Sequence, residues 1–468
     1  GLRVLRAARF VATLGLALLL TSSAPAAAQV QPATPLRVAV GDWFFAPSVE
    51  LRVRGEYRRD PPDVGGTDLA GAGGPAVPNL GVVSERARLG LRAERSQLRI
   101  QLTLQDARVF GVGRPEPSFP RGPRELGLFA PYEAYAEVHG QAAPDGRESF
   151  VRLGRQAIAW GEGVLLGHGD WTPTGTAFDA LRGRWVLGHG ELEAFAALLA
   201  SPAPAGASFG DRFGAPSFGA QLYGLRVGWA FAPALKVEAG GLARVSNTPG
   251  LPTDGSRFAA ARLEGETFTA TVRVHGAADA FDYGVEGIAQ GGRARGLGVD
   301  RRAFGVTARA GYTLGGLLGA PELRAVFSYA TGDDGGGTYT QLDPLVPDVH
   351  DRFGAMDLFA FSNVVAPGAR ITVTPWPALQ AAVQYGYFRM ATGRGEWLNA
   401  YLQAVAVGSG ESGLGHEVDA SVRYQPLGPL VLEAGYGLLA LEPAGRALVA
   451  ARGRPGTDLS HFAFLSAK

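Results

Sequence analysis

The chain has 468 residues, with 44 basic and 43 acidic side chains, a net charge of +1 and no cysteine. This near balance of charge argues neither for nucleic acid as a partner nor for an anionic membrane surface. Without cysteine the chain has no disulfide framework, no thiolate ligand for a metal and no thiol nucleophile. Its stability must therefore come from backbone pairing and packing.

All but two of the basic residues are arginine, and the two lysines are Lys236 and Lys468. A GC-rich genome that favours arginine codons explains such a bias without any function. A guanidinium group also makes forked contacts to carboxylates better than an ammonium group does. The bias is therefore compatible with an acidic ligand and does not establish one.

Residues 1–28 have the organisation of a secretory signal peptide. Three arginines in the first nine positions precede an apolar run at 10–20, and alanines at 26–28 supply small residues before Gln29. The run is too short to cross a bilayer as a helix. An N-terminal helix is the alternative, and the prolines from Pro25 onward disfavour it. We therefore predict export, with a mature start at Gln29.

Residues 49–58 read VELRVRGEYR and alternate strictly between uncharged and charged side chains. Successive side chains of a β-strand point to opposite faces, so this pattern predicts a strand with one apolar and one charged face. In a membrane barrel the apolar face meets lipid and the charged face lines the lumen. The charged set is Glu50, Arg52, Arg54, Glu56 and Arg58.

The same two-residue rhythm recurs along the chain, whereas helical periodicity is essentially missing. It is found at residues 86–94, 97–104, 151–155, 223–229, 236–244, 268–274, 304–312, 323–329, 370–374, 379–387 and 416–424. After the signal peptide no window of about 18 uncharged apolar residues without proline occurs, which excludes helical membrane spans. A closed barrel is the remaining membrane form, because lipid cannot satisfy an open sheet edge.

The connections between these runs fall into two classes. Tight ones lie near Gly190, Pro233, Pro321, Pro375 and Gly428. Long ones rich in Gly, Pro and Asp cover residues 61–81, 111–131, 160–178, 201–216, 331–363 and 443–457. Short periplasmic turns on one rim and long extracellular loops on the other are typical of exported bacterial barrels.

The runs number roughly 18 to 20, each about ten residues long, as a tilted membrane strand requires. A string of β-sandwich domains would instead give repeats of about 100 residues with linkers, and neither is found. We therefore predict an all-β transmembrane antiparallel barrel of about 18 strands over residues 44–468, preceded by a periplasmic segment at 29–43. Aromatic residues of an interfacial belt are Trp43, Phe44, Phe45, Trp229, Phe231 and Trp376.

The charged face of the first strands is strongly basic. Neighbouring strands lie about 4.8 Å apart, so these arginines would form a band on one wall of the lumen and concentrate anions there. Arg and Glu ladders also brace barrel walls without selecting a solute, and the residues alone leave both roles open. The band consists of Arg52, Arg54, Arg58, Arg86, Arg88, Arg92 and Arg99.

A second cluster lies within residues 151–184, where arginine is interleaved with aromatic and hydrogen-bonding groups. Such a mixture suits a sugar acid, which presents hydroxyls, a carboxylate and a flat ring face. Its candidate members for the substrate pathway are Arg152, Arg155, Gln156, Asp170, Trp171, Asp179 and Arg182.

In this cluster GRQ at 154–156, GDW at 169–171 and FDALR at 178–182 resemble the alginate export family of outer-membrane barrels. The segments 342–363 and 416–439 are similar to a late loop and to the closing hairpins of that family. The resemblance implies an 18-stranded barrel that passes anionic polysaccharide or related acidic solutes through an arginine-rich constriction.

Other chemistry finds little support in the residues. No G-x-S-x-G motif occurs and the seven histidines are dispersed, which argues against a surface hydrolase. His168 with Asp170, or His350 with Asp348 and Asp351, could hold Ca²⁺ in a loop, although such pairs more often hydrogen bond locally. We expect no metal and no other cofactor.

The sequence therefore predicts a monomeric, non-enzymatic channel of the bacterial outer membrane, with lipid and an acidic oligosaccharide or sugar acid as partners and no nucleic acid. Selection would be electrostatic and would weaken as salt screens it. A general-diffusion porin of broad specificity is the alternative, and a surface enzyme or adhesin is a more remote one.

Overall fold

The computed structural model of the protein describes residues 36–62, 79–111, 126–143, 145–199, 219–247, 256–408, 410–451, 453 and 456–468, with the side chains of 126–130 excepted. The predicted signal peptide lies outside these residues. Across the described part of the chain, alternation of apolar and polar side chains dominates, so extended strands form almost everywhere.

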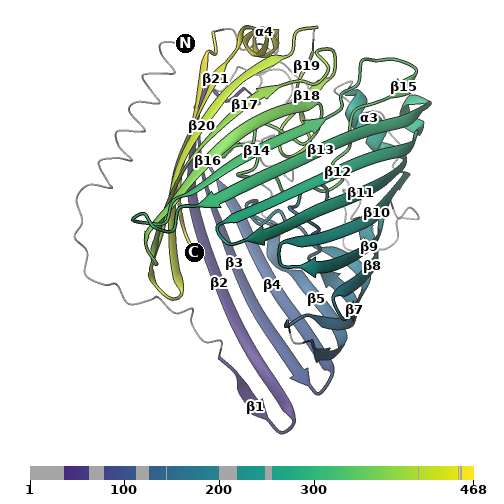
Figure 1. The fold of residues 1–468 in the computed structure, drawn as a ribbon, viewed down its shortest axis with the longest axis vertical. Helices are drawn as coiled ribbons and strands as arrows, with labels where there is room; N and C mark the ends of the chain where they lie inside the picture. Colours follow the sequence, from purple (N-terminus) through teal and green to yellow (C-terminus); the bar gives the residue numbers. More distant parts are fainter. Residues whose placement is uncertain are drawn as a thin grey trace.

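Eighteen antiparallel strands, counted over the described residues, form a closed barrel (Figure 1). Each pairs with its neighbours along the chain, and the first strand, β2, pairs with the last, β22. Closure removes the sheet edges that lipid could not satisfy. The strands are β2 (Trp43–Arg59), β3 (Asn79–Arg95), β4 (Leu98–Phe110), β5 (Leu126–Ala142), β6 (Glu148–Gln156), β7 (Phe178–Leu187), β8 (Gly190–Leu199), β9 (Ala220–Ala232), β10 (Leu235–Asn247), β11 (Glu264–Ala278), β12 (Phe281–Ala294), β13 (Val299–Thr313), β14 (Glu322–Ala330), β16 (Val364–Trp376), β17 (Leu379–Arg389), β20 (Gly413–Leu427), β21 (Leu430–Leu441) and β22 (Leu459–Ala467).

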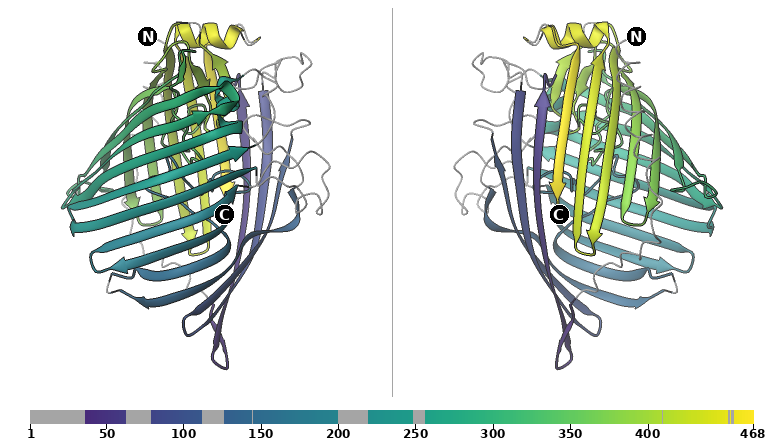
Figure 2. Two further views of the ribbon diagram at one scale, coloured as in Figure 1. Left: turned by 90° about the vertical axis from the view of Figure 1, so that its right-hand side faces the viewer. Right: turned by 90° about the vertical axis from the view of Figure 1, so that its left-hand side faces the viewer.

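Long connections lie on one rim and tight turns on the other, which confirms the two predicted rims, although on the loop rim β12 and β13 are joined by residues 295–298 alone. The long connections carry the short elements, which lie at one end of the barrel, opposite the hairpin of β1 (Val38–Val40) with β2 (Figures 1 and 2). Among the described residues no helix is long and apolar enough to cross a bilayer. The elements of the loop rim are α3 (Arg257–Leu263), η1 (Arg295–Leu297), β15 (Thr338–Tyr339), β18 (Glu396–Leu398), β19 (Ala404–Val407) and α4 (Pro443–Ala451).

The two faces of β2 are turned as the alternation predicts. Leu51 and Val53 are 63% and 50% exposed on the outside, whereas Arg52 and Arg54 are 7% and 1% exposed on the inside. Large apolar side chains are likewise exposed at outward positions of the other strands, for example Leu153 and Val272. A barrel with this exterior places hydrocarbon against the uncharged side of the sheet.

Three long loops fold into the barrel and pack against one another. We call them together the plug: residues 157–177 between β6 and β7, 331–363 between β14 and β16, and the described part of 390–412 between β17 and β20. The first two pair through Leu166 and Val346, where the amide of Gly167 donates to the carbonyl of Val346 at 2.9 Å.

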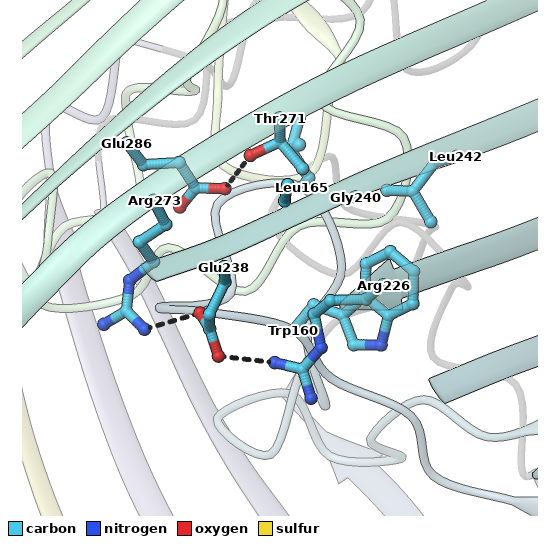
Figure 3. Close-up of a pocket in the computed structure, with 11 residues that line it drawn as sticks. Trp160, Leu165, Arg226, Glu238, Gly240, Leu242, Thr271, Arg273 and Glu286 are labelled. Carbon is cyan, nitrogen blue, oxygen red and sulfur yellow. Dashed lines mark hydrogen bonds and ion pairs between the residues drawn. The ribbon is translucent and has the colours of Figure 1, made fainter. Parts of the chain in front are cut away.

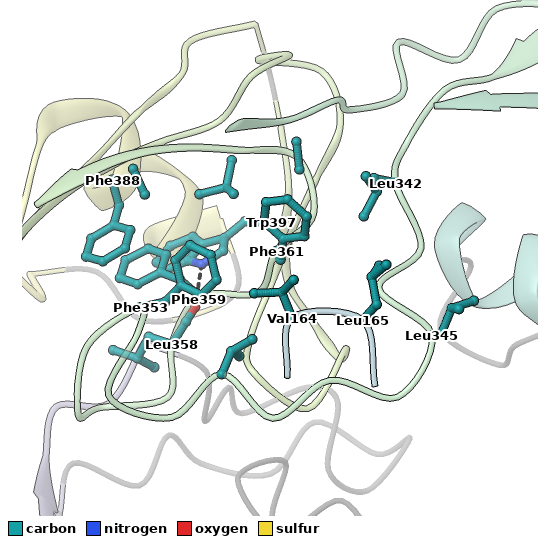
Figure 4. Packing of buried hydrophobic residues seen from close by; sticks show 14 of the residues in the cluster. Val164, Leu165, Leu342, Leu345, Phe353, Leu358, Phe359, Phe361, Phe388 and Trp397 are labelled. Atoms are coloured by element: carbon teal, nitrogen blue, oxygen red, sulfur yellow. Dashed lines mark hydrogen bonds between the residues drawn. The ribbon is translucent and has the colours of Figure 1, made fainter. Parts of the chain in front are cut away.

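The plug and the inner wall share an apolar core, part of which is shown in Figure 4. Phe359 stacks on Phe388 of β17 with ring centroids 3.8 Å apart, and the indole of Trp397 donates to the carbonyl of Leu358 at 2.8 Å. Leu166 from the first loop belongs to the same buried cluster. Because the core is apolar and closely packed, the plug is a built part of the fold and not loose chain in the lumen.

Candidate functional site

The arginines of β2 hold the plug. Arg52 donates to the carbonyls of Asp170 at 2.5 Å and Thr172 at 2.7 Å, and Arg54 donates to the carbonyl of Trp171 at 2.7 Å. Backbone carbonyls of an inserted loop need partners when water is excluded, and guanidinium groups supply several donors each. These arginines therefore fasten residues 170–172 to the wall.

The ring of Trp171 contacts a guanidinium group and an imidazole ring. The guanidinium of Arg54 lies 3.7 Å from its ring centroid on one side, and the ring of His350 stacks 3.7 Å away with an interplanar angle of 7°. A guanidinium over an indole is attracted by the ring quadrupole. Trp171 thus joins β2 to both the first and the second plug loop.

A mixed ion network continues from β2 to β3 beside the plug. Arg86 contacts Glu50 at 2.6 Å and Asp170 at 3.0 Å, Arg88 contacts Asp170 at 3.3 Å, and Lys468 contacts Glu50 at 2.9 Å. Burial alone would raise the pKa of Asp170, but Arg86 and the other nearby cations lower it below its usual value. Asp170 is therefore held as a carboxylate among cations.

Four members of the predicted arginine band are covered by the plug in this structure. Arg52, Arg54, Arg58 and Arg86 are between 1% and 7% exposed, and Arg58 donates to the carbonyl of Met356 at 2.8 Å. They have the bracing role that the sequence left open. Arg92, whose side chain is 42% exposed on the inner face, is the member of the band that is most open to the lumen.

Arg155 and Asp179 lie on the outward face of their strands, whereas the sequence analysis expected them along the solute pathway. They form an ion pair at 3.2 Å and occupy the same face as the outward Leu153 and Leu181. Gln156 points inward but is fully buried and donates to backbone carbonyls. The alternation within 151–155 and 178–182 already separates Arg155 and Asp179 from the inward Arg152 and Arg182. This alternation was the sequence signal for their outward direction.

Arg99, Arg152 and Arg182 do belong to the inner wall, in a series of ion pairs that we call the ladder. Glu137 bridges Arg99 at 2.5 Å and Arg152 at 2.6 Å, and Glu193 bridges Arg182 at 3.0 Å to Arg226 at 3.3 Å. Further along the wall the ladder contains Glu94, Arg184, Glu191, Glu238, Arg273, Glu162, Arg309, Asp282, Arg324 and Glu322.

The sequence analysis missed most of the ladder from Glu193 onward. All of these residues except Glu162, which belongs to the first plug loop, occupy an inward position of a strand, so the two-residue period applied to every strand would have found them. The period does not show that a carboxylate lies between guanidinium groups of neighbouring strands. The observed wall alternates in charge across the strands and is not a purely basic surface.

Glu162 links the ladder to the plug. Its carboxylate accepts from Arg309 of β13 at 2.5 Å and Arg273 of β11 at 3.4 Å, and it also pairs with Arg352 of the second plug loop. Burial alone would raise the pKa of Glu162, but these three arginines lower it to about 2. The contribution of this anchor is therefore present at neutral pH and is lost only as the pH falls toward about 2.

A small recess with a cavity volume of about 20 Å³ lies between the ladder and the first plug loop (Figure 3). Glu238 stands between two guanidinium groups there, with Arg226 and Arg273 each 3.0 Å away. Thr271 donates to Glu286 at 2.7 Å on the neighbouring strands, and the indole of Trp160 forms part of the lining. The lining thus combines guanidinium, carboxylate, hydroxyl and aromatic groups within one recess of the inner wall.

The loop positions considered for a metal make other contacts. The ring of His350 hydrogen bonds Asp357 at 2.8 Å, and Tyr401 donates to the second oxygen of Asp357 at 2.9 Å. Within the described residues no group of three or more His, Asp or Glu side chains is arranged to hold a metal ion.

A closed barrel with an apolar exterior, a charged interior and inserted loops defines a channel of the bacterial outer membrane. The chain belongs to the Alginate export family, which it matches over residues 48–458. No curated protein matches its sequence.

Solved structures show the same fold at low sequence identity. OpdK from Pseudomonas aeruginosa, determined with vanillate, has a TM-score of 0.53 and 12% identity over 90% of this chain and 97% of its own. OccK9 (OpdG) gives 0.53 and 13% over 90% and 97%, and OprD gives 0.52 and 11% over 90% and 94%, both from the same organism. These likenesses support the fold, including the 18-stranded closure.

Proposed function

We propose that the protein is a passive channel for anionic polysaccharide or sugar-acid solutes, which move along the ladder on the inner wall. The observation that carries this proposal is the bridging of Arg226 and Arg273 by one carboxylate, that of Glu238. A pair of guanidinium groups that holds a protein carboxylate also fits the carboxylate of a uronic acid.

The proposed movement is an exchange of ion pairs. Each guanidinium has five N–H donors, so a solute carboxylate binds to it while a protein carboxylate stays attached. The side chains of Arg226, Glu238 and Arg273 are 13%, 17% and 12% exposed, which leaves part of each pair accessible from the pocket.

The test compares two charge-neutral double variants by single-channel recording. Glu238→Gln with Arg273→Gln removes one bridge of the ladder, and Arg155→Gln with Asp179→Asn removes an ion pair of the outer face. We expect uronic-acid oligomers to block the current of the native channel and of the outer-face variant. Block of the ladder variant should weaken about tenfold or more, the effect of losing one charged hydrogen bond.

Anion preference is measured separately from reversal potentials under a salt gradient, and it should be greatest at low ionic strength. Equal block of all three proteins would contradict a role for the ladder. Absence of any block, with no preference between ions, would favour the broad general-diffusion porin, which the matched numbers of acids and arginines in the ladder also fit. Turnover of lipid or glycan would favour the surface-enzyme alternative.

A further inference from the structure

Two carboxylates on β20 face the plug and have no cation beside them in the described ion pairs. Glu417 and Asp419 are separated by one residue and point inward, with exposures of 1% and 7%. The ladder handles its acids differently, because each of them contacts an arginine. A buried, unpaired carboxylate is costly, so this pair needs its own physical explanation.

Each of the two carboxylates holds the plug with one of its oxygens. The amide of Met356 donates to Oε1 of Glu417 at 3.0 Å, and the amide of Ala355 donates to Oδ2 of Asp419 at 3.1 Å. The other two oxygens, Oε2 of Glu417 and Oδ1 of Asp419, have no hydrogen-bond donor among the described residues. The two side chains occupy successive inward positions of β20 and accept from the amides of two adjacent plug residues, so both carboxylates lie in one buried site.

Two ionised carboxylates only accept hydrogen bonds, so a hydrogen bond between them requires a proton on one of them. Like charges in one buried site disfavour double ionisation and favour a single shared proton. The surrounding ionisable groups are His350, Asp351 and Asp357 of the second plug loop, Tyr401 of the third, and Arg54, Glu56 and Arg58 of β2.

His350 responds to pH in the same direction as the pair. Burial opposes its protonation, but the charge and hydrogen bond of Asp357 raise the pKa of His350 above its usual value. A group whose pKa is raised in the packed state stabilises that state at low pH and loses this contribution as pH rises. The segment 350–357 of the second plug loop therefore has two proton-dependent contacts, one through the Glu417–Asp419 pair and one through His350.

We propose that Glu417 and Asp419 form a proton-binding site that latches the plug against β20. With one proton shared, the two carboxylates hold the amides of Ala355 and Met356 and the plug is closed. When the proton is lost, repulsion between the two anions separates them, the segment 350–357 detaches, and the lumen widens. The inference concerns gating and does not depend on which solute passes.

The experiment measures the ratio of open to closed time of single channels in planar bilayers from about pH 5 to about pH 9, the range in which such pairs titrate. Up to two linked protons, one from the pair and one from His350, give a change of up to about a hundredfold per pH unit. The side-chain amide of Glu417→Gln donates to Asp419 at any pH, so this contact no longer depends on a titrating proton. In this variant the ratio of open to closed time should change about tenfold less for each pH unit than in the native channel, and Asp419→Asn should act in the same way.

Glu433→Gln, on the neighbouring strand and paired with Arg423 at 2.6 Å, is the matched control and should keep the native slope. A native channel whose gating ignores pH overturns the proposal, as does a slope that is the same in the native, Glu417→Gln and Asp419→Asn proteins. If neither variant assembles, the native pair is probed through Ala355→Cys in this cysteine-free chain. Its labelling rate relative to the exposed Leu317→Cys should rise with pH, and a constant ratio overturns the latch.

Discussion

Replacing Glu162 by glutamine tests whether a single carboxylate fastens the first plug loop. The substitution keeps the shape and one acceptor oxygen but removes the charge that faces Arg273, Arg309 and Arg352. Three guanidinium groups from two strands and the second plug loop then lose their common counter-ion. We expect the barrel to stay assembled, because the backbone hydrogen bonds between strands are untouched, and the plug to open more often.

The size of the effect follows from the contacts. A hydrogen bond to a charged group contributes about 1.5–3 kcal/mol and a neutral one about 0.5–1.5 kcal/mol, so three such exchanges remove about 3 kcal/mol. The carboxylate is 20% exposed, and screening by water reduces this to about 2 kcal/mol. That amount raises the fraction of detached plug about thirtyfold.

The assay is thiol labelling of Val164→Cys, a position that is 1% exposed two residues from Glu162 in a chain without native cysteine. Labelling requires detachment, so its rate reports the detached fraction when opening is fast and reversible. Glu433→Gln in the same Val164→Cys background is the control. Labelling within a factor of three of the control would refute the anchoring role, since the expected change is about tenfold larger.

Three other changes give distinct results. Trp171→Ala removes the ring held by Arg54 and His350, and a loss of about 3–5 kcal/mol should loosen the plug, seen as larger current fluctuations at unchanged barrel melting temperature. His350→Gln keeps a hydrogen-bonding group beside Asp357 but does not titrate, so gating should be linked to about one proton fewer. The difference from the native channel should appear above the ordinary pKa of histidine, because the pKa of His350 is raised. Leu51→Arg places a charge on the lipid face and should lower stability toward denaturant by about 2–4 kcal/mol, whereas an unchanged unfolding midpoint would contradict the orientation of β2.

Much of the fold was predictable because its determinants are local. The two-residue period in 49–58 decides which face of β2 meets lipid, and Gly- and Pro-rich segments mark the connections. Counting these runs gives roughly 18 to 20 strands, the family resemblance implies 18, and closure follows because lipid cannot satisfy an open sheet edge. The family resemblance carried by residues 154–156, 169–171 and 178–182 agrees with the match over 48–458.

The site was harder to predict because its contacts join distant parts of the chain. Arg52 meets Asp170 and Thr172, and Arg58 meets Met356, through insertion of loops whose path no local pattern encodes. A basic residue on the inner face therefore has the same sequence pattern whether it touches solute or braces a loop.

Side-chain direction, by contrast, was encoded and was not applied evenly. Arg155 has the parity of the outward Leu153, and Asp179 has that of the outward Leu181. The charge at these two positions does not change the period of the strand. The outward ion pair is satisfied locally at 3.2 Å, which is how a lipid-side strand end tolerates two charges.

The pairing of β2 with β22 also governs how the molecule is assembled. Ser460 contacts the backbone of Arg59 across 401 positions of the chain, so this seam forms between the earliest and the latest strands to be synthesised. Until both are present the growing sheet carries two unsatisfied edges, which invite pairing with other chains. Such a distant contact is also slow to find. Deleting β22 should therefore abolish insertion, whereas trimming a loop tip should not.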